Sequence, residues 1–136
     1  MAVPMTFNLS GDKEFMHRLA AVESDLRNRA IQRGLSAGAL IVAGNVKEHL
    51  YVGHGQVTGT YKRSVGQSPR GPDTWGVGTN LLQGPRLEYG FIGTDKLGRR
   101  YNQAPIPHFR PGLRESRDEV LEAFRTVVNH ILRSAR

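Results

Sequence analysis

The chain has 136 residues, the size of one domain, and a formal net charge of +7. It contains no cysteine, which excludes disulfides and thiolate metal sites, and no segment approaches the roughly 20 apolar residues of a membrane-spanning helix. The first ten residues lack a basic segment followed by an apolar one, so no signal peptide is indicated and we expect a soluble protein made in the cytoplasm.

The excess positive charge is concentrated in the middle of the chain. Residues 57–114 contain nine basic and three acidic residues, whereas residues 1–56 contain six and five, and residues 115–136 contain four of each. A localised positive field attracts phosphate backbones or an acidic protein partner. The alternative is that these basic residues only keep a small domain in solution.

The first part of the chain is predicted to be mainly helical. A weak alternation over residues 5–9 is compatible with a short strand, and a first helix is predicted over residues 11–21. A second, longer helix is predicted over residues 24–50 from its apolar residues at helical spacing. Its many glycines and alanines indicate that another backbone packs very close to it. The alternative is a kink or break near Gly34 or Gly44.

The middle of the chain is predicted to form antiparallel strands and turns. The strand candidates are residues 61–65, 74–79 and 86–92, the last of which alternates apolar and polar side chains. Residues 69–72 (Pro-Arg-Gly-Pro) predict a turn that cannot lie inside a sheet. Residues 94–102 are predicted to form a polar, basic loop.

The chain ends in a predicted amphipathic helix. Residues 104–109 are expected to be extended because two prolines restrict the backbone, and the helix follows over residues 111–133 with Pro111 in its first position. Together these elements predict a single α+β domain over residues 1–136. It has two N-terminal helices, the second one long, a small antiparallel sheet in the middle, and the C-terminal helix packed on that sheet.

No pattern typical of catalysis or metal binding is evident in the sequence. The five histidines fall in four predicted elements without paired metal-ligand spacing. Residues 53–59 are glycine-rich, but they miss the dinucleotide-binding spacing and follow a helix, which indicates a turn. A nuclease using His54 or His108 would need basic groups within hydrogen-bond reach, and nothing in the sequence brings them there. We therefore expect no enzyme, no cofactor or metal site, and no small-molecule substrate.

Three stretches, in this order along the chain, carry a family resemblance. Residues 58–65 (Thr-Gly-Thr-Tyr-Lys-Arg-Ser-Val) are similar to a Thr-Gly-x-Leu-(basic)-(basic)-Ser-Ile motif. Residues 77–80 (Val-Gly-Thr-Asn) and 87–90 (Leu-Glu-Tyr-Gly) resemble a Gly-(Thr/Ser)-Asn strand and a Glu-(aromatic)-Gly turn. Residues 104–113 (Ala-Pro-Ile-Pro-His-Phe-Arg-Pro-Gly-Leu) are similar to a proline-rich entry to a C-terminal helix. The family with these motifs is the tail-component family encoded in the head–tail morphogenesis modules of tailed bacteriophages.

The resemblance also marks positions with a structural role. These turn, strand-end and helix-entry positions are Thr58, Gly59, Gly78, Asn80, Gly90, Pro107, Phe109 and Pro111. Gly59 is expected to take a positive φ, and Phe109 to anchor the last helix in the core. This chain departs from the family in two places. Residues 55–57 (Gly-Gln-Val) replace the usual Ala-Pro before Thr-Gly, and Gly112 stands where alanine is common.

The resemblance implies a structural virion protein that acts in head–tail joining or tail completion. Such a protein would assemble in the host cytoplasm as a homo-oligomeric ring in the neck or upper tail, against adjacent neck and tail proteins and with no membrane partner. Its ring would contact the genomic DNA loosely as the DNA passes through the channel. The candidate residues for subunit contacts or for the channel surface are Lys62, Arg63, Glu88, Lys96, Arg99 and Arg100.

Some of these candidate residues have more than one interpretation. Lys62 and Arg63 are expected on the strand over residues 61–65. Glu88 is either a surface partner of Arg86 or Lys62, or part of a salt bridge across a subunit boundary.

Two alternatives remain open for the function. One is a nucleic-acid-binding protein that uses the basic residues 57–114, for which steep salt dependence would be diagnostic. Its charge lies outside the predicted helices, so no recognition helix is evident, and few aromatic residues are interleaved for base stacking. The other alternative is a minor tail protein placed further down the tail tube.

Overall fold

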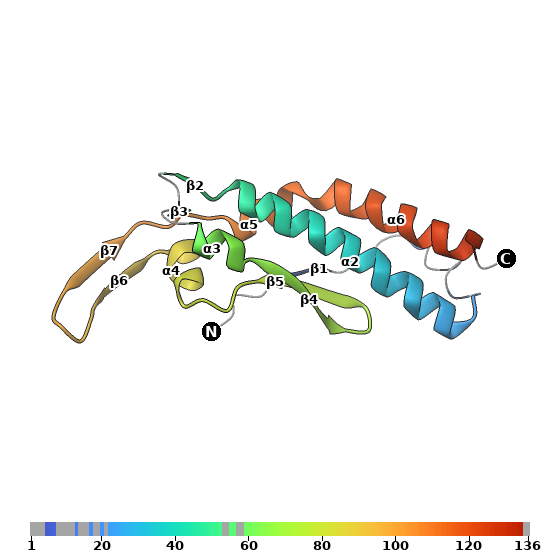
Figure 1. Ribbon diagram of the computed structural model, residues 1–136, viewed down its shortest axis with the longest axis horizontal. Helices are drawn as coiled ribbons and strands as arrows, with labels where there is room; N and C mark the ends of the chain where they lie inside the picture. Colours follow the sequence, from blue (N-terminus) through green and yellow to red (C-terminus); the bar gives the residue numbers. More distant parts are fainter. Residues whose placement is uncertain are drawn as a thin grey trace.

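The computed structural model describes residues 5–7, 13, 17, 20, 22–52, 55–56 and 59–134. The molecule is elongated (Figure 1). Two long helices lie side by side with a small sheet against them, and a two-stranded hairpin extends beyond one end of this body of helices and sheet. The mixture of helices and small sheets confirms the predicted α+β class. In chain order the elements are β1 (Met5–Phe7), α2 (Ser24–Glu48), β2 (Tyr51–Val52), β3 (Gly55–Gln56), α3 (Thr60–Ser64), β4 (Gly66–Gly71), β5 (Thr74–Gly78), α4 (Gln83–Tyr89), β6 (Phe91–Thr94), β7 (Arg100–Gln103), α5 (Phe109–Glu115) and α6 (Arg117–Ser134).

The N-terminal predictions are confirmed where the structure describes them. The short strand expected over residues 5–9 is β1, over Met5–Phe7. Of the helix predicted over residues 11–21, only residues 13, 17 and 20 are described, and all three are helical. The rest of that helix lies outside the described residues.

The long helix α2 confirms the predicted second helix and its close packing. The Glu23 carboxylate caps its N-terminus by accepting hydrogen bonds from two backbone N–H groups of the first turn. The helix is continuous over Ser24–Glu48, so the break considered near Gly34 or Gly44 is wrong. Gly34 is buried, and a β-carbon there would lie 2.6 Å from the Phe124 ring of α6. A β-carbon at Gly44, by contrast, would meet no atom of the described residues within 4 Å outside its own stretch of helix.

The predicted C-terminal helix is present but starts earlier and is divided in two, and α6 packs mainly on α2 and not on the sheet as predicted, because α2 lies against β4 and β5. Ser116 separates α5 from α6: its hydroxyl donates to the Gly112 carbonyl (2.6 Å) and accepts from the Asn45 amide (2.7 Å). Because α5 begins at Phe109, Pro111 is its third residue and not its first. The first turn still accommodates proline, since the N–H groups there have no helical acceptor.

Gly112 allows α5 to lie directly on α2. A β-carbon at this position would lie 2.6 Å from the Val46 side chain and 2.8 Å from the Val46 backbone. Backbone cannot yield as a flexible side chain can, so alanine would push the two helices apart. The departure from the family pattern at Gly112 therefore has a packing reason in this chain.

The core lies between the helical layer and the sheet. Phe109 is fully buried, which confirms its predicted role as the anchor of the last helix. Around it lie buried apolar residues of α2, α3, β5 and α6 and of the junctions after α2 and α3: Ala39, Val42, Ala43, Val46, Leu50, Tyr61, Val65, Val77 and Val120. A second cluster joins the N-terminal half of α2 to α6 through Ala30, Leu35, Phe124 and Val128.

The main sheet has the order β1-β5-β4 and is antiparallel throughout. The strand predicted over residues 74–79 is β5, at its centre. The turn predicted over residues 69–72 is wrong in part, because Pro69 lies in β4 and only Pro72 and Asp73 form the turn. β4 is an edge strand, where a proline need not donate to a neighbouring strand.

Two other predicted strands are helices. The first, over residues 61–65, is the short helix α3, which starts directly after Gly59. Gly59 has φ +80°, which confirms the positive φ predicted for this glycine. The second, over residues 86–92, is mostly α4, and only its end belongs to β6. In α4, Gly84 and Glu88 share the buried face while Tyr89 is exposed, which reverses the predicted burial.

The polar loop predicted over residues 94–102 is wrong in part, because only residues 95–99 form a turn, while Thr94 ends β6 and residues 100–102 belong to β7, which pairs antiparallel with β6. The remaining strands, β2 and β3, form a very short parallel pair. None of the described helices combines the length and apolar composition needed to cross a membrane.

Candidate functional site: a hairpin arm and the clasp at its base

The hairpin over residues 91–103, called the arm here, leaves the body of the protein and returns to it at one place. Glu88 lies just before the arm and is fully buried. Its carboxylate accepts hydrogen bonds from the backbone N–H groups of His108 (2.7 Å), Phe109 (2.9 Å) and Arg110 (3.0 Å), just after the arm. Since no side chain of its own segment caps α5, Glu88 supplies the cap from 20 residues upstream.

The buried charge of Glu88 is compensated by Arg110. The Arg110 guanidinium donates to the Glu88 carboxylate (2.9 Å) and to the Glu88 carbonyl (3.1 Å), and it lies 4.9 Å from the centre of the Tyr89 ring. Burial raises the pKa of Glu88, but the three backbone N–H groups and Arg110 outweigh it, so the net shift of the pKa is downward. Glu88 is therefore held as a carboxylate inside the protein.

A buried Tyr–His pair extends this hydrogen-bonded group to α3. The Tyr61 hydroxyl lies 2.6 Å from His108 Nε2, and His108 Nδ1 lies 2.8 Å from the Ile106 carbonyl. A carbonyl only accepts, so Nδ1 carries the proton, and Nε2 of a neutral ring accepts from the tyrosine. Burial, and secondarily the charge of Glu88, raises the pKa of Tyr61. We call Tyr61, Glu88, His108 and Arg110 the clasp.

Backbone contacts bring the two ends of the arm together. The Ile106 N–H donates to the Leu87 carbonyl (2.6 Å). Gly90 has φ +81°, and a β-carbon there would lie 2.8 Å from the Gln103 carbonyl oxygen and 3.1 Å from Pro105. Gly90 is thus required both by its conformation and by the returning chain.

Inside the arm, Asp95 organises the turn. Its carboxylate accepts from the backbone N–H groups of Leu97 and Arg99 (both 2.9 Å), from the Arg99 side chain (2.6 Å) and from the Tyr101 hydroxyl (3.0 Å). Desolvation raises the pKa of Asp95, but these hydrogen bonds outweigh it and lower the pKa below its usual value. Gly98, at φ +79°, completes the turn.

One face of the arm packs on itself. The Phe91 ring lies over Gly93, where a β-carbon would be 2.8 Å away, and its centre is 6.1 Å from that of the Tyr101 ring. The Arg86 guanidinium lies 4.1 Å from the centre of the Phe91 ring. These contacts stiffen a two-stranded hairpin, which by itself would be marginally stable in water.

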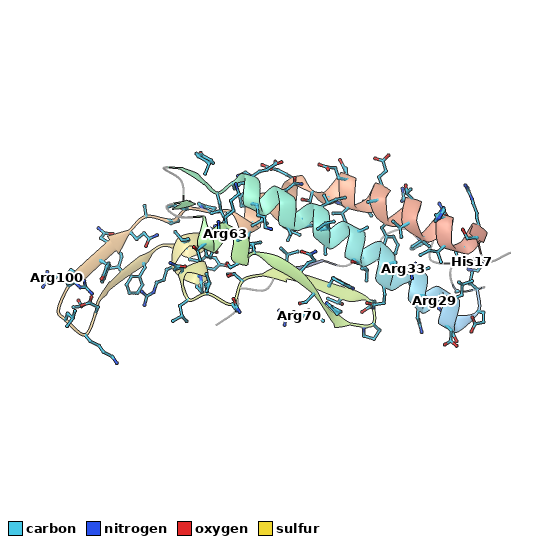
Figure 2. The ribbon with its side chains drawn as sticks, viewed as in Figure 1. His17, Arg29, Arg33, Arg63, Arg70 and Arg100 are labelled. Atoms are coloured by element: carbon cyan, nitrogen blue, oxygen red, sulfur yellow. The ribbon has the colours of Figure 1, made fainter. Side chains whose placement is uncertain are left out.

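The other face and the tip of the arm are uncovered. Ile92 is 82% exposed and Leu97 is 78% exposed, and Lys96 and Arg100 are exposed beside them. Figure 1 shows β6 and β7 extending away from the helices, and Figure 2 places Arg100 near the far end of the arm. The arm is therefore a pre-organised projection with apolar and basic groups at its end.

The candidate residues from the sequence fall into three groups. Lys96, Arg99 and Arg100 lie together on the arm, although Arg99 is paired with Asp95. Lys62 and Arg63 lie on α3 and not on a strand; Figure 2 shows Arg63 well apart from Arg100.

Glu88 forms the third group, and both of its predicted roles are wrong. It is fully buried and bonded within its own chain, so it is neither a surface partner of Arg86 or Lys62 nor available for a salt bridge to another subunit. The physical reason is that the N–H groups that start α5 need a buried acceptor, and Glu88 is the group placed to supply it.

The structural-motif residues have mixed outcomes. Gly78 ends β5, and Pro107 precedes α5 in the extended segment predicted there. Asn80 is exposed, whereas its neighbour Thr79 is buried and bonded to the Ser64 hydroxyl (2.7 Å). Thr58 lies outside the described residues.

Sequence reasoning missed the roles of Tyr61, His108, Arg110 and Asp95. For Asp95 a signal was available, because Asp-Lys-Leu-Gly-Arg over residues 95–99 is a typical turn sequence with an aspartate at its start and a glycine near its end. For the clasp no local signal exists, since its partners are 20 or more residues apart.

The described residues contain no group of three or more His, Asp and Glu side chains that could hold a metal ion. Comparison with protein-family models, with curated proteins and with solved structures found no match to this chain.

Proposed function

We propose that this chain is a structural virion protein of a tailed phage, acting in head–tail joining or tail completion as a subunit of a neck or tail ring. The observation that carries the proposal is the clasped arm, together with the sequence motifs that resemble the phage tail-component family. Glu88 and Gly90, both in one of those motifs, hold the base of the arm. The motifs thus coincide with the parts of the fold that position a projecting element.

The chemistry of the arm suits contact with another protein. Single exposed apolar residues are common on protein surfaces. On this arm, however, Ile92 and Leu97 extend from a hairpin whose own packing lies on the opposite face and at the base. Interfaces are enriched in apolar, aromatic and arginine side chains, which the arm combines. We therefore assign the arm to contacts with neighbouring ring subunits or with adjacent neck and tail proteins.

This role is non-catalytic and needs no cofactor and no small-molecule substrate. Assembly takes place in the host cytoplasm, and the finished protein is located in the neck or upper tail of the virion. Basic side chains such as Lys62 and Arg63 contact the passing DNA only loosely, so that the genome can still leave.

The alternative function is nucleic-acid binding through the basic residues 57–114. The exposed pair Lys96 and Arg100 at the end of the arm favours it. Against it, the labelled arginines in Figure 2 are distributed along the whole molecule and do not gather in one stripe. Carboxylates also pair with Arg99 and Arg110. Direct DNA binding should weaken steeply with salt, whereas a structural role predicts no tight binding at physiological salt.

The proposal is tested by electron microscopy of a lysate from a phage whose copy of this gene carries an early stop codon. We expect DNA-filled heads beside unattached tails, or tails of wrong length. Normal infectious virions would refute the structural role, and DNA-binding assays across a salt series would then test the alternative.

A further inference from the structure

The large apolar side chains on the surface of this protein are unevenly distributed. Among the described residues seven of them are exposed, and five of these seven lie within residues 82–101, which comprise α4 with its cap and most of the arm. The long helix α2 contributes one, Leu40, and α6 contributes none. A concentration of exposed apolar groups marks a surface that another molecule covers. The five side chains are those of Leu82, Tyr89, Ile92, Leu97 and Tyr101.

These side chains extend from the base of the arm to its tip. Leu82, at the N-cap of α4, and Tyr89, at the end of α4, are seven residues apart and therefore lie on one face of this helix, 70% and 58% exposed. In β6, Ile92 lies on the face opposite to the packed ring of Phe91, because neighbouring residues of a strand alternate between faces. Leu97 lies in the turn of the hairpin. Figure 1 shows α4 at the base of the arm and this turn at its far end.

The charge left uncompensated on this surface is positive. Residues 82–101 contain only two acidic residues, Glu88 and Asp95, and each is paired with an arginine of this chain. Among the described ion pairs, none joins a carboxylate to the three remaining exposed basic residues: Arg86, Lys96 and Arg100. The surface therefore combines apolar side chains with positive charge, which suits a partner that is apolar and acidic.

No described face of this chain offers such a partner surface. The largest group of exposed acidic residues is on α6, where the exposed Arg117 and Arg125 lie among them. At the start of α2, Glu23 and Asp25 are followed within about one turn by Arg27 and Arg29. Because the charges of both groups are mixed, a second copy of this chain is not the complementary partner.

Neither DNA nor a membrane accounts for the whole surface. A phosphate backbone would pair with Lys96 and Arg100, but it would leave the apolar side chains of α4 and β6 in water. A bilayer reached by the tip of the arm would accept Leu97, but Leu82 and Tyr89 at the base of the arm would remain outside it (Figure 1). A groove on another protein can cover the ribbon along its length.

We propose that residues 82–101 dock in an apolar groove rimmed by carboxylates on a different protein. This inference rests on the proposed function, and it names the neighbour as an adjacent neck or tail protein and not another ring subunit. The clasp and the Asp95 turn hold the surface in shape before binding, so little conformational entropy is lost in the contact. The arginines stacked on Tyr89 and Phe91 add the side-chain types that are enriched at protein interfaces.

The contact is tested by site-specific photo-cross-linking in cells infected with the stop-codon phage and supplied with the full chain from a plasmid. The photoreactive amino acid p-benzoylphenylalanine takes the place of Leu97 in the test variant and of Leu40 in the matched control. Leu40 is also a largely exposed leucine, but it lies on α2, away from the arm. Mass spectrometry of each adduct identifies the cross-linked molecule and the peptide that was reached.

Position 97 should give an adduct with one other protein, at a peptide rich in Asp and Glu, in a yield about tenfold above that of position 40. An adduct with a second copy of this chain, with DNA or with lipid would overturn the proposal. So would a cross-linked peptide without acidic residues, or a yield no higher than that of the control.

Charge reversal tests the role of the basic side chains. Lys96→Glu with Arg100→Glu should lower the yield of the adduct by about an order of magnitude. The matched control, Arg29→Glu with Arg33→Glu, changes the net charge equally at exposed positions of α2 and should leave the yield unchanged. Equal losses in the two variants would show that net charge and not this surface governs the contact, which would overturn the proposal.

Two further variants keep this test independent of folding. Changing carboxylates of the cross-linked peptide to lysine should restore the yield with the reversed arm, and failure to restore it would refute the pairing of charges. Leu82→Ser, an uncharged change at an exposed position outside the clasp, should lower the yield several-fold. An unchanged yield would refute docking of residues 82–101 as one surface. Circular dichroism and the midpoint of denaturant unfolding confirm that each variant is folded.

The outcomes separate this inference from the proposed function. Loss of the specific adduct, together with unattached tails in the stop-codon lysate, would leave the virion role standing and reject only this contact. A specific adduct with an acidic protein, combined with normal virions from the stop-codon phage, would retain the docking surface and reject the virion role.

Discussion

The helical layer and the arm are stabilised by opposite means. In the layer, α2 meets α6 and α5 through apolar side chains and through Gly34 and Gly112, which let backbones and rings approach closely. The arm has almost no core, and carboxylates hold it: Glu88 at its base and Asp95 in its turn each accept several hydrogen bonds. The comparison teaches that an element projecting from the core can still be rigid when buried or turn-forming acids satisfy the backbone N–H groups around it.

The largest effect is expected from emptying the helical interface. Phe124→Ala removes a ring that is almost fully buried between α2 and α6, and it should lower the free energy of unfolding by about 3–5 kcal/mol. Denaturant unfolding measures this change. Phe124→Leu, which keeps most of the volume, should cost less than half as much. Equal losses for the two variants would mean that this interface is not packed around the ring.

The clasp should be nearly as sensitive, although it contains little apolar surface. Glu88→Ala leaves three N–H groups and Arg110 without their acceptor inside the protein, and we expect a loss of about 3 kcal/mol in the free energy of unfolding. In the Glu88→Ala variant, hydrogen exchange should also be faster for the backbone amides of the arm than for those of α2. Glu88→Gln retains one carbonyl acceptor and serves as the milder control. If Glu88→Ala unfolds no more easily than Glu88→Gln, the neutral carbonyl oxygen of glutamine does not replace the carboxylate as acceptor, and if Glu88→Ala is as stable as the wild type, the clasp does not stabilise the fold.

A pH series sharpens the same comparison. The pKa of Glu88 is lowered in the folded protein from an ordinary value of 4.5, so its stabilising contribution is complete above about pH 4.5 and is lost as the pH falls through the folded pKa. The other titratable and charged groups around this carboxylate are Tyr61, His108 and Arg110. They are the same in the wild type and in Glu88→Gln, so comparing these two proteins isolates the titration of Glu88. The stability difference between wild type and Glu88→Gln should therefore shrink as the pH falls from 6 to about 3. A stability difference that stays constant across this pH range would refute the assignment of the pH dependence to the Glu88 carboxylate.

The smallest effect separates packing from helix propensity within α2. Gly44→Ala should raise the free energy of unfolding by about 0.5–1 kcal/mol, because alanine favours the helix and has open space there. Gly34→Ala should lower it, since its β-carbon would lie 2.6 Å from the Phe124 ring. Thermal or denaturant unfolding of the two variants checks the signs. The same sign for both would show that the two glycines do not differ in their surroundings.

The amino-acid sequence alone determined the long elements and the main anchors. Apolar residues at helical spacing placed α2 and the C-terminal helix, residues 74–79 were predicted as the strand that is β5, and Phe109 between two prolines was identified as a core anchor. These signals are local and repeat over many residues, so they need no knowledge of partners.

Only the tertiary structure decided the short elements and the site. The helices α3 and α4 have five and seven residues, too few for local propensity to fix, and both were predicted as strands. Their conformation follows from distant contacts: Tyr61 must reach His108, and Glu88 must reach the N–H groups that begin α5. The alternation of apolar and polar residues around Glu88 predicted a half-exposed strand. The sequence alone does not show that Glu88 lies next to the N–H groups that begin α5. The clasp and the projection of the arm arise when the folded chain brings residues 88 and 108 together.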